Sequence, residues 1–155
     1  MKVPVLVAVE KRQTRNGTKP GYVAIRMVKS LSSAVVKDFV DSKIVSGSVI
    51  ETDGLSIYGV LDGSDFIHKP YFTKNGSKAK ELFPWVHLVI GNLKRFILGT
   101  HHHADPKYLR LYVSEYCYRL NRRFHEDDLF EHLLKACLLV SLRKHNILGF
   151  RQNSL

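Results

Sequence analysis

The order of the predicted elements favours an α/β fold with a mixed sheet and a helical C-terminal half. Three observations predict it. Strand patterns dominate the first half of the chain, one helical pattern interrupts them after the second strand, and helical patterns follow one another from Pro84 onward. The chain has 155 residues, 45% of them hydrophobic, which suits one ordinary core. We therefore expect a single domain spanning residues 1–155.

Four apolar runs in the first half predict strands, and polar or glycine-containing connections separate them. The predicted strands are residues 5–9, 22–28, 48–52 and 66–72. Asn16, Gly17 and Gly21 punctuate the connection between the first two, which is typical of a hairpin. Residues 55–61 are expected to form a short helical turn, and residues 74–80 a basic loop.

A crossover helix is predicted between the second and third strands, over residues 31–44. Ser32 or Ser33 supplies its cap, and Gly47 lies beyond its end. Its apolar stripe consists of Leu31, Val35, Phe39 and Val40.

The second half predicts three helices, over residues 84–98, 106–123 and 127–144. Pro84 and Pro106 suit the first turns of two of them, and Gly99 suits the end of the first. The only tryptophan, Trp85, is expected to anchor its helix against the sheet. The apolar stripe of the middle helix consists of Leu109, Tyr112, Val113, Tyr116, Cys117 and Leu120.

The net charge of +10 points to a polyanionic partner, and we expect DNA. An anionic membrane is disfavoured, because no apolar run reaches the roughly 18 residues that a spanning helix needs. The N-terminus does not resemble a signal peptide, so a cytoplasmic location is expected. The two cysteines, Cys117 and Cys137, have no metal-site spacing and are expected to be core thiols.

Asp53 stands at the polar end of the third predicted strand, beside Gly54. Open α/β sheets place their reacting groups at such strand ends. The plain alternative is that an aspartate before a glycine forms a turn or caps a helix.

The stretch from Trp85 to Arg123 resembles the C-terminal part of bacterial insertion-sequence transposases of the DDE superfamily, the group with an N-terminal zinc ribbon. The landmarks are Leu93-Lys94-Arg95, Gly99-Thr100-His101-His102, Pro106-Lys107-Tyr108-Leu109, Glu115-Tyr116 and Tyr118-Arg119-Leu120-Asn121-Arg122-Arg123. Upstream, residues 47–58 and 5–10 are similar to two strands of that family. The resemblance implies a ribonuclease-H-like (integrase-type) fold that cleaves and joins DNA strands with two Mg²⁺ or Mn²⁺ ions.

By this resemblance Asp53 is the second catalytic acid, His87 takes the third catalytic position, and Lys94 is the basic residue seven positions later. Asp53 and His87 would hold metal. Residues seven apart lie almost on one helix face, so His87 and Lys94 share a face, whereas Asn92 is about 140° away from His87. Asn92 stays the alternative third position. A neutral imidazole can bind a divalent metal, although Mg²⁺ prefers oxygen ligands.

Basic residues of the same region are expected to contact double-stranded DNA. They are Lys94, Arg95, His101, His102, Lys107, Arg119, Arg122 and Arg123. A solvated basic face, and a salt bridge from Glu115 to Arg119, are the plain alternatives. Zinc binding by His101-His102-His103 is disfavoured, because consecutive loop residues do not easily converge on one ion. The resemblance also implies a homo-oligomer on DNA and a nucleoid-associated location.

In the resembling family the first catalytic Asp lies on a strand before the hairpin, and residues 1–9 contain no carboxylate. We therefore expect a partial catalytic domain that lacks this strand and the N-terminal DNA-recognition domain, and that is inactive as this fragment. The alternative is a remnant that binds DNA or dimerises without chemistry. A metal-independent nuclease or an RNA-binding module is disfavoured, because no ribonucleoprotein or KH-type motif occurs.

Overall fold

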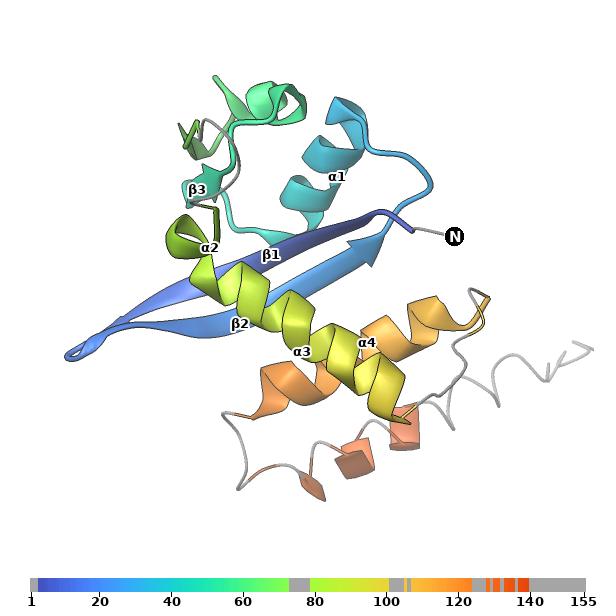
Figure 1. Ribbon diagram of the computed structural model, residues 1–155. Coiled ribbons are helices and arrows are strands. Elements are labelled where there is room, and N and C mark those ends of the chain that lie inside the picture. Colours follow the sequence, from blue (N-terminus) through green and yellow to red (C-terminus); the bar gives the residue numbers. More distant parts are fainter. Residues whose placement is uncertain are drawn as a thin grey trace, which may run out of the picture. The chain divides into compact units, whose positions relative to one another are not determined.

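A computed structural model describes residues 3–72, 79–100, 105, 107–123, 128, 130, 131, 133–135 and 137–139. The chain divides into two compact units, Met1–Asn121 and Arg122–Leu155, and each is described by itself. The elements are β1 (Val5–Thr14), β2 (Gly17–Met27), α1 (Ser33–Lys43), β3 (Val49–Thr52), the 3-10 helix η1 (Ser56–Leu61), β4 (Ile67–Pro70), α2 (Ala79–Leu82), α3 (Pro84–Thr100) and α4 (Leu109–Arg122) (Figure 1).

Strands β1 and β2 form the predicted hairpin, but both are longer than predicted. They pair antiparallel from Val5 opposite Met27 to Thr14 opposite Gly17, with an irregularity between Val9 and Lys11. A two-residue turn joins them, and Gly17 follows it with φ 112°. The apolar run that predicts the first strand stops after Val9, so the sequence pattern could not reveal the polar continuation.

Gly21, expected in the connection, lies inside β2. A Cβ atom there would come 2.2 Å from Oε2 of Glu10, so the glycine makes room for that carboxylate. The carboxylate accepts a hydrogen bond from the Tyr22 amide at 2.7 Å and pairs with Arg12 Nε at 3.0 Å. The hydrogen bond from Arg12, followed by that from Tyr22, lowers the pKa of Glu10.

Helix α1 is close to its prediction. Ser32 is its N-cap, and the Ser32 hydroxyl accepts from the Val35 amide at 3.4 Å. Its buried residues are Val36, Phe39 and Val40. Leu31, predicted in the stripe, is 47% exposed because the helix begins only at Ser33; Val36 takes the core position instead.

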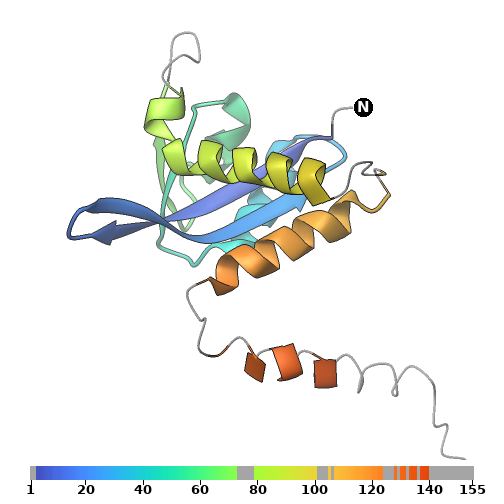
Figure 2. The same ribbon diagram turned by 60° about the horizontal axis from the view of Figure 1, so that its bottom comes forward.

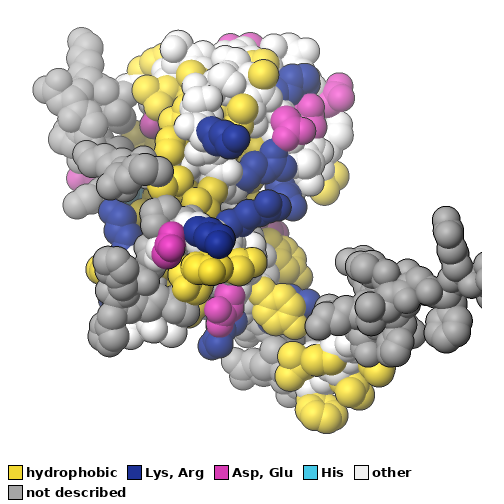
Figure 3. Space-filling view, turned by 90° about the vertical axis from the view of Figure 1, so that its right-hand side faces the viewer, with side chains coloured by type: hydrophobic (Ala, Val, Ile, Leu, Met, Phe, Trp, Pro, Cys, Tyr) yellow, Lys and Arg dark blue, Asp and Glu magenta, His cyan; other side chains and the backbone are white. Residues whose placement is uncertain are grey.

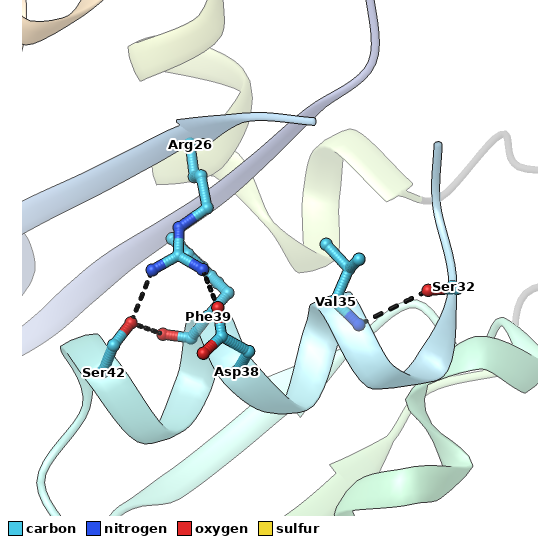
Figure 4. A network of polar contacts seen from close by, with 6 residues as sticks. All are labelled: Arg26, Ser32, Val35, Asp38, Phe39 and Ser42. Carbon is cyan, nitrogen blue, oxygen red and sulfur yellow. Dashed lines mark hydrogen bonds and ion pairs between the residues drawn. The ribbon is translucent and has the colours of Figure 1, made fainter. Parts of the chain in front are cut away.

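Arg26 of β2 ties the hairpin to α1 (Figure 4). Its guanidinium pairs with Asp38 and donates to Ser42 Oγ at 2.7 Å, and the Ser42 hydroxyl donates in turn to the Phe39 carbonyl at 2.9 Å. The same guanidinium lies 5.4 Å from the centre of the Phe39 ring. Charge pairing and stacking on an aromatic ring together fix how α1 lies on the strand.

Strands β3 and β4 pair in parallel, from Val49 opposite Ile67 to Thr52 opposite Pro70. The expectation of one mixed sheet is wrong for the described residues: they contain two separate two-stranded sheets, β1–β2 and β3–β4. Side chains connect the two sheets, since Lys11 Nζ of β1 lies 3.2 Å from Glu51 Oε2 of β3. In the described part of the chain, each of these four strands therefore has one edge without a partner strand.

Two apolar cores lie on opposite faces of the hairpin (Figures 1 and 2). The first packs α1 and η1 on the hairpin and consists of Leu6, Val36, Phe39, Val40, Leu61 and Phe66. The second packs α3 and α4 on the other face and consists of Val23, Val89, Leu93, Val113 and Tyr116. Successive residues of a strand point to opposite faces, so Leu6 and Ala8 join the first core, and Val7 and Val9 the second.

Helix α3 begins at Pro84 as predicted and runs past Gly99 to Thr100. Helix α4 begins at Leu109, whereas Pro106, the predicted first-turn residue, lies outside the described residues. The predicted basic loop lies mostly outside them too. Where described, the predicted last helix is helical at residues 130, 131, 133–135 and 137–139.

Both cysteines are free. Cys117, predicted as a core thiol, is half-buried, and burial raises the pKa of its thiol. The prediction is wrong for Cys137, which is exposed. Within the described ranges, no helix is long and apolar enough to cross a membrane.

Candidate catalytic and DNA-binding site

Asp53 follows β3 directly, and its side chain is exposed. Among the described residues, its Oδ1 atom accepts one long hydrogen bond, 3.4 Å, from the amide of Leu55. The next residue, Gly54, has φ 73°, and a Cβ atom there would lie 2.8 Å from the ring of Phe72. The positive φ favours glycine, and a side chain at this position would also have to displace the exposed Phe72 ring. The chain turns sharply after Asp53, and the carboxylate is exposed.

A chain of polar contacts from the exposed Asp62 through the buried His68 imidazole holds the end of β3 just before Asp53. His68 of β4 has a side chain that is only 4% exposed, and its Nδ1 lies 2.6 Å from Asp62 Oδ1. Its Nε2 lies 2.8 Å from the hydroxyl of Thr52, itself a buried polar residue. Asp62 favours the tautomer with the proton on Nδ1, which leaves Nε2 to accept from Thr52. The sequence predictions missed this set, because the pairing depends on a contact between residues that are distant in the sequence.

Tyr71 connects the end of β3 to the beginning of α3. Its amide donates to the Thr52 carbonyl at 2.8 Å, extending the parallel ladder by one residue. Its ring meets that of Phe83 edge to face, with centres 6.0 Å apart. Phe83 immediately precedes α3, and its carbonyl accepts from the His87 amide at 3.2 Å. The segment carrying Asp53 and the first turn of α3 are thus joined through Tyr71 and Phe83.

His87 and Lys94 are both exposed on α3. Seven residues is close to two helical turns, so they share one face. Asn92, the alternative third position, is partly buried, and its Oδ1 accepts from Arg95 Nη2 at 2.6 Å. An amide oxygen has two lone pairs, so this bond leaves Asn92 as the alternative third position.

The charge of Asp53 acts on the phenol of Tyr58. Burial raises the pKa of Tyr58, and the negative charge of Asp53 raises it further. The Tyr58 hydroxyl therefore stays protonated across the physiological range and carries no charge into the site.

Among the described residues, no three His, Cys, Asp or Glu side chains gather as metal ligands. The donors singled out by sequence are one carboxylate, Asp53, and one imidazole, His87. Mg²⁺ commonly keeps several waters and binds proteins through one or two carboxylates, so this donor set fits part of a site.

The predicted DNA contacts are distributed over both units. Lys94, Arg95 and Lys107 are exposed, and Figure 3 shows Lys and Arg side chains gathered across one face. Arg119 Nη2 lies 2.8 Å from Glu115 Oε1, which is the salt bridge predicted as the alternative to a DNA contact. Arg122 and Arg123 begin the second unit and are partly buried. His101 and His102 lie outside the described residues.

Two landmark residues of the α4 region have structural roles. The Asn121 side chain accepts from the Val23 amide and donates to the Val23 carbonyl, both at 2.8 Å, as a neighbouring strand would. Tyr116 is 8% exposed, and its hydroxyl donates to the Val89 carbonyl of α3 at 3.2 Å. Tyr116 therefore packs in the core and does not belong to a DNA-contacting surface.

Comparison with known families gives one result. The model of the ISXO2-like transposase domain matches residues 1–121, most of the chain. The chain belongs to the insertion-sequence DDE transposases. The match ends where the first compact unit ends. No curated protein and no solved structure matches the chain.

Because it belongs to this transposase family, the chain has a function related to transposition. The family also implies that its partner is DNA. The family is one of DNA-processing enzymes, which agrees with the net charge of +10.

Proposed function

We propose that the first unit is part of a ribonuclease-H-like catalytic domain that cleaves and joins DNA strands during transposition. In this proposal Asp53 and His87 are ligands of a divalent cation, Mg²⁺ or Mn²⁺, and Lys94 contacts a phosphate next to the reacting one. The substrate is double-stranded DNA, and two or more copies of the chain act together on paired DNA ends.

The contact from Thr52 through Tyr71 to Phe83 carries the proposal. It links the strand end that presents Asp53 to the first turn of the helix that presents His87 and Lys94. All three side chains are exposed, as groups that meet a large substrate need to be.

Each residue has a separate role in this chemistry. Asp53 supplies a hard oxygen ligand and His87 a nitrogen ligand. When bound, the divalent cation offsets the negative charge that develops at the phosphorus and helps to deprotonate the attacking water or hydroxyl. Lys94 is a flexible point charge, suited to a phosphate oxygen and not to proton transfer.

The unpartnered strand edges support a further part of the proposal. Both β1 and β3 have a free edge in the described residues, and their side chains meet at Lys11 and Glu51. We propose that the complete sheet includes another strand that carries the first catalytic carboxylate. The chain by itself would then bind a cation weakly through two ligands and would not join DNA strands.

Paramagnetic broadening by Mn²⁺ tests the ligand assignment without requiring activity. In amide nuclear magnetic resonance spectra of the chain, low Mn²⁺ should broaden signals around Gly54 and His87 first. Asp53→Asn should abolish this pattern. Asp41→Asn removes an exposed carboxylate from α1 and should leave it unchanged. Broadening that persisted in Asp53→Asn would remove Asp53 from the site.

A nicking assay on a longer protein that supplies the expected first strand tests the chemistry. Cleavage with Mg²⁺ should fall at least about a hundredfold in Asp53→Asn and in His87→Ala, because changing even an outer-shell partner of a metal ligand typically costs about 10–100-fold. Full activity of His87→Ala would refute the third position. DNA binding without cleavage by the longer protein would favour the remnant alternative.

A further inference from the structure

The distal half of the hairpin, residues 10–22, extends beyond the apolar cores. The hairpin residues that join either core lie within 6–9 and 23–28, and none of residues 10–22 does so. Figures 1 and 2 both show the turn of the hairpin reaching past the helices. The tip of this distal ribbon, residues 13–17, is exposed, whereas Gly21 near its base is buried. The tip is therefore open to solvent or to a partner, and the buried part of the hairpin serves as its base.

The distal ribbon is strongly basic. Residues 11–20 contain four cationic side chains, Lys11, Arg12, Arg15 and Lys19, and no acidic one. Lys19 lies directly opposite Arg12 in the ladder, although like charges in that position destabilise a sheet. Arg12 is paired with Glu10, and Lys11 with Glu51. Arg15 and Lys19 take part in no ion pair within the described part of the chain. An unneutralised pair of cations at the tip favours an anionic partner.

We propose that the distal ribbon enters the major groove of double-stranded DNA, with Arg15 and Lys19 on the phosphates at its rims. The inference rests on the proposed function, because it takes the same DNA as its partner. The ladder from Lys11–Pro20 to Thr14–Gly17 is about 10 Å long, and paired strands lie about 5 Å apart. The major groove is about 12 Å wide and about 8.5 Å deep, and it admits a two-stranded ribbon.

One hydrogen bond couples the distal ribbon to the candidate site. Trp85 Nε1 donates to Thr18 Oγ1 at 3.1 Å. Trp85 is the second residue of α3 and stands two positions before His87. DNA held by the ribbon is therefore held in a fixed orientation to the helix that carries His87 and Lys94. Trp85 acts as a positioning residue in this arrangement.

Duplex binding by the full chain at several salt concentrations tests the proposal. Arg15→Gln with Lys19→Gln removes two charges from the ribbon. The slope of log affinity against log salt should fall by about 2, one unit for each phosphate that the variant no longer neutralises. Lys29→Gln with Lys37→Gln removes the same charge from exposed lysines elsewhere in the first unit and should leave the slope unchanged. Because all four side chains lie on the surface, both variants should fold, as thermal unfolding would verify.

Photo-crosslinking gives a second measurement. A benzophenone side chain at Asn16, in the turn, should crosslink to duplex DNA, whereas one at Ser46, in the exposed turn after α1, should not. Equal slopes in the two double variants, together with no crosslink at Asn16, would overturn the ribbon proposal and leave the proposed function standing. If the unchanged chain bound no duplex at any salt concentration, both proposals would fall.

Discussion

His68 shows that the candidate site depends on residues that no motif marks. Its imidazole connects the exposed Asp62 to the buried Thr52, the residue before Asp53. The sequence could place Asp53, because a polar residue beside a glycine at a strand end is visible in the one-dimensional pattern. It could not pair Thr52 with His68, because that pairing depends on the register of β3 with β4.

Replacing His68 should destabilise the fold and disturb the end of β3. His68→Leu removes both hydrogen bonds and leaves the Thr52 hydroxyl buried without its imidazole partner, which typically costs about 1–3 kcal/mol. Urea unfolding measures this cost. Lys69→Leu alters the exposed neighbour on the same strand and should change stability by less than about 0.5 kcal/mol. An equal effect of the two substitutions would contradict the role given to His68.

Comparing Gly54 with Gly63 separates two reasons why a larger residue at Gly54 would destabilise the fold: the left-handed backbone conformation and the contact with the Phe72 ring. Gly54 and Gly63 have nearly the same backbone angle, φ 73° and φ 70°, but only Gly54 lies against Phe72. Gly63→Ala therefore measures the cost of the left-handed conformation alone, about 1 kcal/mol. Gly54→Ala should cost more, because the added carbon meets the ring. The double variant Gly54→Ala with Phe72→Ala should recover part of the difference in unfolding free energy; no recovery would show that the ring is not the cause.

Helix α4, and not a neighbouring strand, supplies the hydrogen bonds of the β2 backbone at Val23. Asn121 of α4 pairs with both backbone groups of Val23, a residue of the second core. An asparagine within a run of arginines reads from sequence as part of a basic face. The sequence does not reveal that Asn121 pairs with the backbone of β2, because the contact joins residues 98 positions apart.

Asn121→Leu should cost about 1–3 kcal/mol, since it leaves a part-buried amide and carbonyl of Val23 without partners. Hydrogen exchange at the Val23 amide should also become faster. Asn92→Leu is the matched control, because Asn92 is also a helical asparagine, but it bonds to an exposed arginine side chain. If Val23 exchanged at the same rate in both variants, the pairing would be unimportant in solution.

The strand and helix predictions agreed with the structure where buried apolar residues form a recognisable pattern in the sequence. They failed where a segment has no such pattern. The apolar run from Val5 to Val9 located the first strand of the hairpin, and the polar residues beyond it gave no sign that pairing continues to Thr14. Parallel pairing of β3 with β4, separate from β1 and β2, depends on long-range contacts that a single sequence does not display.

At the scale of the whole molecule, both apolar cores lie within the first unit, and the family match covers the same residues. A chain ending at Arg123 should therefore keep its cooperative unfolding and lie within about 3 °C of the full chain in Tm, less than the change that a destabilisation of about 1 kcal/mol causes in a small domain. Calorimetry measures it. A broad, non-cooperative transition would show that the first unit needs residues beyond Arg123.

The unpartnered edges of β1 and β3 also bear on solubility. Backbone groups along a free edge are a template for any extended peptide, including the same edge on another molecule, and charged side chains are a common protection against such pairing. Lys11 and Glu51 are so placed, one on each strand. Where these edges stay uncovered, the two charged side chains oppose edge-to-edge pairing into fibres. Concentrated salt screens these charges and would therefore lower the solubility of the protein.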